Sequence, residues 1–146
     1  MKMRLKWLVL AALLALPVLG QTAELPPIID RELFFGDPEI AGAQISPDGQ
    51  FIAFVKPYKG TRNVWVKRTN EPFSAARPVT ADMKRPIPGF FWTRDSKYIL
   101  FVQDKAGDEN YNIFAVNPAD PAAAGQDVPA ARNLTDAKGA RAVIYN

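Results

Sequence analysis

The sequence predicts an all-β fold built from repeated four-stranded units, and a recurring turn with the strand behind it indicates this fold. The pattern of residues 46–55 returns in altered form at residues 93–102. Ser-Pro-Asp-Gly at 46–49 has the residue order of a type I turn. The runs that follow both turns show little polar alternation, which is typical of strands covered on both faces. This spacing predicts a β-propeller, whose four-stranded blades take roughly 40–50 residues each.

The first predicted blade spans residues 39–80. Turn signals and apolar runs divide it into four antiparallel strands with a hairpin at 57–60, and the strands are expected at 39–45, 50–56, 63–68 and 77–80. Proline at position 78 fits only an outer strand or a strand end, because proline cannot donate to a sheet ladder.

The second predicted blade spans residues 87–135 and repeats the same order of elements. Its strands are expected at 87–92, 97–103, 111–116 and 132–135, with a longer hairpin at 104–109. Residues 141–146 read as the first strand of a third, truncated blade. The predicted fold is therefore an incomplete propeller, because two blades and one strand cannot close a ring of typically four to eight blades. We expect the chain to be the front portion of a longer protein or a truncated reading frame.

The N-terminal segment 1–23 has the pattern of a secretory signal peptide. Basic residues precede an apolar run at 7–19, and small residues place the cleavage after Gly20 or Ala23. The run is short for a membrane span, although an uncleaved anchor is the alternative interpretation. The expected destination is secreted, most simply a bacterial periplasm, with no membrane attachment after cleavage. Residues 24–38 then form an extended or short helical segment, whose Phe34 and Phe35 we expect to pack against a blade.

The composition excludes several classes of function. The chain contains no cysteine and no histidine. It therefore holds no disulfide, no Cys or His metal site and no Ser-His-Asp triad of its own. Three of its 18 basic residues and none of its 15 acidic residues lie in the first 20 positions, so the rest of the chain is electrically balanced. No electrostatic argument for nucleic-acid binding remains.

The candidate sites in the sequence carry little chemistry. Asp104, Asp108 and Glu109 lack the spacing of an EF-hand loop and are expected at a solvated hairpin tip. The basic pairs at 67–68 and 84–85 are expected on the surface, and the aromatic run at 90–92 is expected in the core. The chain has no Gly-x-Ser-x-Gly elbow and no glycine-rich phosphate loop. We assign no catalytic, cofactor-binding or metal-binding residue and no cofactor.

The blade pattern resembles the propeller domain of the prolyl oligopeptidase family, which includes dipeptidyl aminopeptidases and acylaminoacyl peptidases. The resemblance is carried by a few segments, and these are residues 25–27, 30–36, 45–54, 63–66, 92–100 and 107–110. It covers nearly the whole chain after the signal peptide. The Ser-Pro-Asp-Gly turn by itself also occurs in non-enzymatic periplasmic propellers of the Tol system.

The resemblance implies a propeller of seven or eight blades that caps a C-terminal α/β-hydrolase domain. Ser, Asp and His of that second domain cleave short peptides in such enzymes, and the propeller restricts access by size. None of those catalytic residues has a counterpart in this chain, which should be inactive alone. Two alternatives stay open, namely a non-enzymatic propeller that acts as a protein-binding scaffold and a short product that assembles several copies into a ring.

Overall fold

The computed structural model describes residues 25–36 and 38–145, and the chain divides into two units at Gly36. The predicted signal peptide lies outside the described residues. The first unit holds one short helix, α2 (Glu32–Phe35), beside which Asp30 Oδ1 accepts a hydrogen bond from the Glu32 N–H at 3.0 Å. The side chains of Phe34 and Phe35 are exposed, and their expected packing against a sheet stays a prediction. Within the described part of the chain, no helix has the length and apolarity needed to cross a bilayer.

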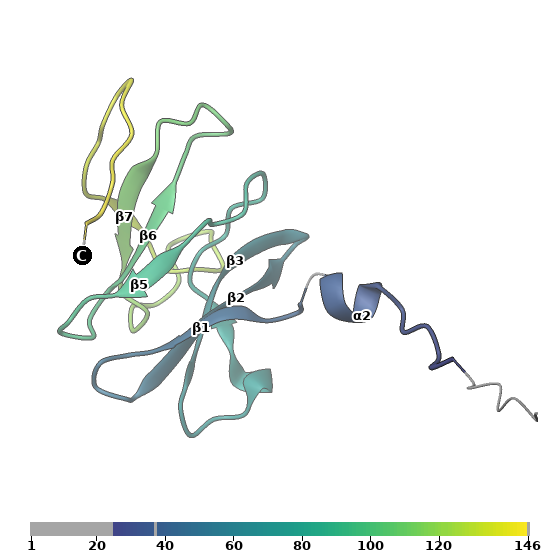
Figure 1. Ribbon diagram of the computed structural model, residues 1–146. Coiled ribbons are helices and arrows are strands. Elements are labelled where there is room, and N and C mark those ends of the chain that lie inside the picture. Colours follow the sequence, from purple (N-terminus) through teal and green to yellow (C-terminus); the bar gives the residue numbers. More distant parts are fainter. Residues whose placement is uncertain (1–24, 37, 146) are drawn as a thin grey trace, which may run out of the picture. The chain divides into compact units, whose positions relative to one another are not determined.

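The second unit consists of two four-stranded antiparallel sheets, which confirms the all-β prediction (Figure 1). The first sheet contains β1 (Ala41–Ile45), β2 (Phe51–Tyr58), β3 (Thr61–Arg68) and β4 (Arg77–Pro78), with the short 3-10 helix η1 (Phe73–Ala75) before β4. The second sheet contains β5 (Phe90–Trp92), β6 (Ile99–Gln103), β7 (Asn112–Val116) and β8 (Arg132–Asn133). In both sheets neighbouring strands along the chain are neighbours in space.

The hairpin between β2 and β3 is tighter than the sequence predicts. The strands extend to Tyr58 and resume at Thr61, so only Lys59 and Gly60 form the turn. Both residues have positive φ, 48° and 89°, the backbone of a two-residue hairpin turn whose twist matches that of the strands. The predicted loop at 57–60 is therefore wrong for Pro57 and Tyr58, which belong to β2. Pro57 lies one residue from the end of this strand and is exposed.

The two repeated turns are built by the same hydrogen bonds. The Gly49 N–H donates to the Ser46 carbonyl at 2.8 Å, and Asp48 Oδ1 accepts from the Ser46 hydroxyl at 2.5 Å and from the Gln50 N–H at 3.0 Å. In the second turn, Thr93 and Asp95 make the equivalent bonds at 2.6–3.1 Å. The turn prediction is confirmed at both places, although Ser96 stands where the first turn has a glycine and takes a φ of 61°.

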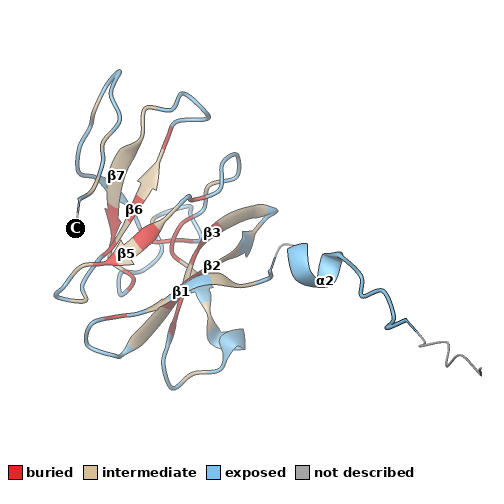
Figure 2. Ribbon diagram, in the orientation of Figure 1, coloured by how far each residue is buried: buried red, intermediate tan, exposed pale blue. Residues whose placement is uncertain are grey.

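The core of the second unit lies between the two sheets, and Figure 2 shows buried residues near the middle of the strands. Because residues directly opposite in an antiparallel pair project to the same side, the register assigns each side chain to a face. The first sheet contributes Ala53, Val64, Val66 and Val79 to this core; the second contributes Phe90, Trp92, Ile99, Phe101 and Val116, and Ile87 lies at their junction. The sheets therefore pack face to face through unlike faces.

Each sheet fastens the segment behind its fourth strand with one asparagine. Asn63 accepts from the Thr80 hydroxyl and the Asp82 N–H at 2.9 and 2.8 Å, and its amide donates to the carbonyls of Thr61 and Asp82. In the second sheet, Asn112 makes the equivalent bonds with Asn110, Thr135 and Ala137, at 2.7–3.2 Å. We call this arrangement the asparagine clamp. It repeats with the sheet and fixes where the chain leaves it.

We expect Gly49→Ala to lower the free energy of unfolding by about 1 kcal/mol, because a Cβ at φ +72° is strained although nothing lies within 4 Å of it. Gly89→Ala is the matched control, since its Cβ also meets open space and its φ is not positive. Urea unfolding of the two variants should show a loss only for Gly49. Equal losses would contradict the turn geometry.

We expect Asn63→Ala to cost about 2–4 kcal/mol of stability, because Asn63 is fully buried and its loss leaves several buried polar groups without partners. Asn112→Ala should cost about 1 kcal/mol, since the same groups there are partly exposed and water can replace the amide. Denaturant unfolding of both variants checks the difference. A larger loss for Asn112 would show that burial does not set the cost.

We expect the turn aspartates to make stability fall in acid. The hydrogen bond from the Ser46 hydroxyl lowers the pKa of Asp48, and that from Thr93 lowers the pKa of Asp95. A carboxyl with a lowered folded pKa stabilises the fold above its unfolded pKa and loses this contribution as the pH falls through the folded value. The double variant Asp48→Asn and Asp95→Asn should therefore lose less stability than the wild type below about pH 4. Parallel unfolding curves against pH would refute this.

Candidate functional site

The basic pairs predicted on the surface divide in the structure. Lys84, Arg85 and Arg68 are exposed, as predicted, but Lys67 is buried with 5% of its surface exposed. Its ammonium donates to the carbonyls of Arg68, Thr69 and Glu71 at 2.8–3.3 Å and lies 5.1 Å from the centre of the Phe73 ring. The surface prediction is therefore wrong for Lys67. The loop behind β3 supplies a ring of carbonyls that replaces the water around the charge.

The acidic hairpin between β6 and β7 is a solvated tip only in part. Asp108 and Glu109 are exposed, as predicted, whereas the Asp104 side chain is 3% exposed and lies 3.7 Å from Arg85 Nε. Asp104 also accepts from the Glu109 N–H at 3.4 Å. The solvated-tip prediction is wrong for Asp104, because the loop folds back over it. Among residues 25–36 and 38–145, no three acidic side chains gather closely enough to hold a metal ion.

Two of the three aromatic residues in β5 belong to the core, as the sequence predicts, whereas Phe91 pairs with Leu100 and is half-buried on the opposite face. Phe90 and Trp92 are buried between the sheets, and Trp92 stacks on Phe51 of β2 with ring centres 6.2 Å apart. The Trp92 indole also donates to the Gln44 carbonyl at 3.4 Å, while the Gln44 amide donates to the Phe90 carbonyl at 2.8 Å. These contacts join β1 and β5, the first strands of the two sheets. Phe90 and Trp92 therefore fix how the two sheets meet.

One cavity of about 600 Å³ opens between the two sheets. The hairpin end of β2, the segment after β4, strand β6 and the loop 125–131 line it. The apolar part of its wall includes Val79, Phe101 and Val128, which are buried. Polar side chains stand at its margin, and the Gln103 amide donates to Asp82 there. The cavity has the size of a small-molecule site, but several of its polar side chains, among them Gln103 and Asp82, already bond to each other.

A three-residue network closes one side of this cavity. The Tyr58 hydroxyl donates to Asp127 Oδ2, and Lys59 Nζ lies 3.0 Å from the same oxygen. The hydrogen bond from Tyr58, followed by the Lys59 bond and charge, lowers the pKa of Asp127. The bond with Tyr58 and then that with Asp127 raise the pKa of Lys59. Both groups are held charged, so the network ties the β2–β3 hairpin to the loop between β7 and β8 and prepares neither group for proton transfer.

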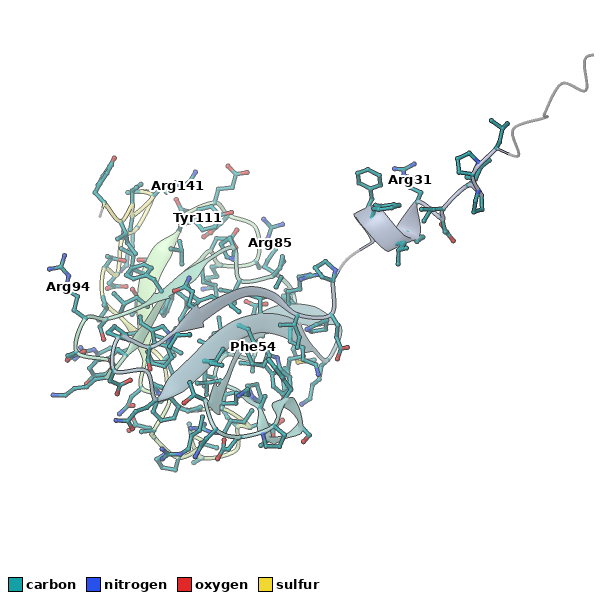
Figure 3. The ribbon with its side chains drawn as sticks, turned by 60° about the horizontal axis from the view of Figure 1, so that its bottom comes forward. Arg31, Phe54, Arg85, Arg94, Tyr111 and Arg141 are labelled. Carbon is teal, nitrogen blue, oxygen red and sulfur yellow. The ribbon has the colours of Figure 1, made fainter. Side chains whose placement is uncertain are left out.

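A second cavity, of about 670 Å³, lies beside the acidic hairpin. Its wall carries both signs of charge, from Asp82, Lys84, Asp104, Lys105 and Lys138 among others. Figure 3 shows Arg85 on the same side of the molecule as Tyr111 and Arg141, and the Arg141 guanidinium lies 4.9 Å from the centre of the Tyr111 ring. This mixed and partly paired charge gives no preference for an anionic or a cationic ligand.

Sequence reasoning missed the long-range pairs that shape this region. Asp127 is 69 positions from Tyr58, and Asp82 is 21 positions from Gln103. Neither pair lies within a local motif, so spacing could not indicate it. The same holds for Arg77, whose guanidinium donates to the Pro118 carbonyl across the two sheets. The repeat itself was the usable signal, because it predicted which strands lie side by side.

Comparison with known proteins identifies relatives for part of the chain, although no protein-family model matches it. Ninety residues, 62% of the chain, are 40% identical to dipeptidyl aminopeptidase BIII of Pseudoxanthomonas mexicana. Ninety-one residues are 38% identical to dipeptidyl peptidase family member 6 of Caenorhabditis elegans. The matched part spans 13% and 12% of these relatives, about an eighth of their length. The chain is thus similar to a small part of dipeptidyl peptidases, and this relationship to the peptidase family is its best-supported affiliation.

Proposed function

We propose that this chain is the N-terminal part of a β-propeller in a secreted dipeptidyl peptidase of the prolyl oligopeptidase family. The observation that carries the proposal is the 38–40% identity to two proteins named as dipeptidyl peptidases. The blade motif, which resembles the propellers of that family, agrees with it. The activity of the whole protein would be the release of dipeptides from short peptides.

The packing of the two sheets supports a propeller arrangement. Propeller blades are four-stranded antiparallel sheets whose strands follow one another in order, and each blade rests on the next. Here both sheets have that strand order, and one face of the first sheet packs on the opposite face of the second. Because each sheet uses unlike faces, the arrangement can continue in the same direction at both ends.

The segment behind the second sheet supports a third blade. In the first sheet the Ile87 N–H donates to the Arg62 carbonyl at 3.0 Å as the chain crosses to β5. The Ala142 N–H donates at 2.8 Å to the carbonyl of Tyr111, which occupies the position of Arg62 in the second sheet. Residues 141–145 form no strand in the structure. They nevertheless leave the sheet by the route that leads to β5 in the first repeat, which favours the start of another blade.

The proposed role of this part is to restrict access by size, and it leaves the chemistry to a C-terminal α/β-hydrolase domain. The chain has no histidine and no Gly-x-Ser-x-Gly sequence, so the Ser-Asp-His triad of such a domain must lie elsewhere. The proposed partners are therefore peptide substrates and that hydrolase domain. The pattern of residues 1–23 favours secretion, in a bacterium to the periplasm.

The test begins with the coding sequence that follows the codon for Asn146. We expect it to encode further four-stranded repeats and then a Gly-x-Ser-x-Gly motif with a later Asp and His. The longer protein should release p-nitroaniline from dipeptidyl substrates and lose this activity when the motif serine is changed to alanine. The 146-residue chain serves as the inactive control. Repeats without hydrolase motifs would contradict the peptidase and leave a binding scaffold, and activity of the 146-residue chain would contradict the proposed division of roles.

A further inference from the structure

The second sheet has an apolar face on the side away from the first sheet. The register places Leu100 opposite Ala115 and Val102 opposite Ile113, so all four side chains project to one side. We call these four residues the forward face of the second sheet. Ala115 is buried, and the other three are half-buried. None of the four side chains carries a charge or a hydrogen-bonding group.

The first sheet has the same forward face, and there it is covered. Ala53 lies opposite Val66 and Val55 opposite Val64, at the positions of the four residues in the second sheet. The exposed fraction is 0% for Ala53 and Val64 and 1% for Val66. The larger side chain of the pair changes strand between the sheets. It is Val66, opposite Ala53, in the first sheet and Leu100, opposite Ala115, in the second. The forward face thus keeps its apolar character from one sheet to the next.

The opposite face of the second sheet provides that cover. Ile99, Phe101 and Phe114 project to this side, and the same positions in the first sheet hold Ile52, Phe54 and Trp65. We call these last three residues the rear face of the first sheet. Ile52 and Trp65 are half-buried, whereas Phe54 is 1% exposed because the Phe73 ring packs on it. The chain therefore carries both halves of the contact, and the loop behind β3 covers part of the rear face of the first sheet.

The rear face of the first sheet brings no unpaired charge to a contact. Lys56 lies 3.0 Å from Glu39 and 5.7 Å from the centre of the Trp65 ring, and Lys67 is saturated by three carbonyls. The Phe73 ring, 53% exposed, packs edge-on against Phe54 at 5.4 Å and extends the apolar surface. Covering this face therefore avoids the large cost of burying an isolated charge.

We propose that the forward face of the second sheet binds the rear face of the first sheet of a second copy of this chain. The contact uses the strand positions of the contact between the two sheets, with Phe73 lying over Phe54, and it rests on the proposed propeller arrangement. It is head to tail, because each copy uses a different face, so it can grow into chains or close into a ring. In a longer chain the following sheet occupies the same face at an effective concentration in the millimolar range, and it displaces the second copy.

An arriving sheet has to displace the C-terminal segment. Val143 and Tyr145 are 55% and 89% exposed, whereas Ala142 and Ile144 are half-buried and the Ala142 N–H donates to the Tyr111 carbonyl. The displacement therefore breaks this hydrogen bond and uncovers two small contacts, which the arriving sheet replaces. Association through this face is expected to depend on the protein concentration. A contact between two molecules must overcome the loss of translational and rotational freedom, which the linker between β4 and β5 spares the internal contact.

The test is the oligomeric state of the 146-residue chain with one face damaged at a time. Val102→Lys places a charge on the forward face, and Ile52→Lys places one on the rear face. We expect the wild type to associate with rising concentration in sedimentation velocity, and each variant alone to associate about tenfold more weakly or to stay monomeric. A mixture of the two variants retains one intact face of each kind. It should therefore form a dimer and nothing larger.

Arg94→Ala is the control, since Arg94 is exposed in a turn and projects away from the sheets (Figure 3). If either lysine variant melts at a much lower temperature than the wild type, Ile52→Thr and Val102→Thr keep the branched shape and still weaken the contact. A monomeric wild type, association that persists in both single variants, or a mixture that stays monomeric would each overturn the proposal. Association driven by the apolar run at 7–19 would persist in both single variants and would therefore overturn the proposal. None of them affects the peptidase proposal, which the coding sequence beyond Asn146 tests independently.

Discussion

The burial of unlike sheet faces is the constraint on which the rest of this structure depends. An antiparallel sheet with apolar side chains on both sides needs cover on both sides, and here each sheet covers one side of the other. The interleaving of Val64 and Val66 with Ile99, Phe101 and Val116 makes one core from two repeats. The polar loops follow from this, because they only have to lead the chain from the last strand of one sheet to the first strand of the next.

Two hydrogen-bonded arrangements fix this path of the backbone in both repeats. The Asp-centred turn sets where the second strand of each sheet begins, and the asparagine clamp sets where the chain leaves the fourth strand. The Asp48 N–H also donates to the Ser96 hydroxyl at 3.0 Å, so the two turns support each other. The two asparagine clamps differ in burial, since Asn63 is covered and Asn112 is partly exposed. The sequence repeat therefore preserves the hydrogen bonds that fix the backbone as well as the apolar strands.

Local chemistry made the strands and turns predictable, whereas tertiary contacts decided the rest. Ser-Pro-Asp-Gly and the apolar runs predicted the strands of the two sheets to within a few residues, because turn residues and strand pattern act over short distances. The strand predicted at 141–146 is not formed at residues 141–145. The hairpin boundary was wrong because β2 continues through Pro57 and Tyr58 and leaves only Lys59 and Gly60, both with positive φ, for the turn. The burial of Lys67 and Asp104 was missed for another reason. Their partners are loop carbonyls and Arg85, which only the folded chain brings together.

The same reasoning gives a physical basis for the 40% identity between 90 residues of this chain and a dipeptidyl aminopeptidase. Sheet stacking constrains many positions at once, since each strand residue meets a neighbour in its own sheet and another in the next sheet. The larger side chain of Leu100 in place of Ala53, for example, comes with a smaller one at the paired position, where Ala115 replaces Val66. Packing between the sheets is therefore one physical constraint that keeps such a sequence similar to its relatives. Under the proposed function, other residues supply the chemistry and the sheets shape the path to that site.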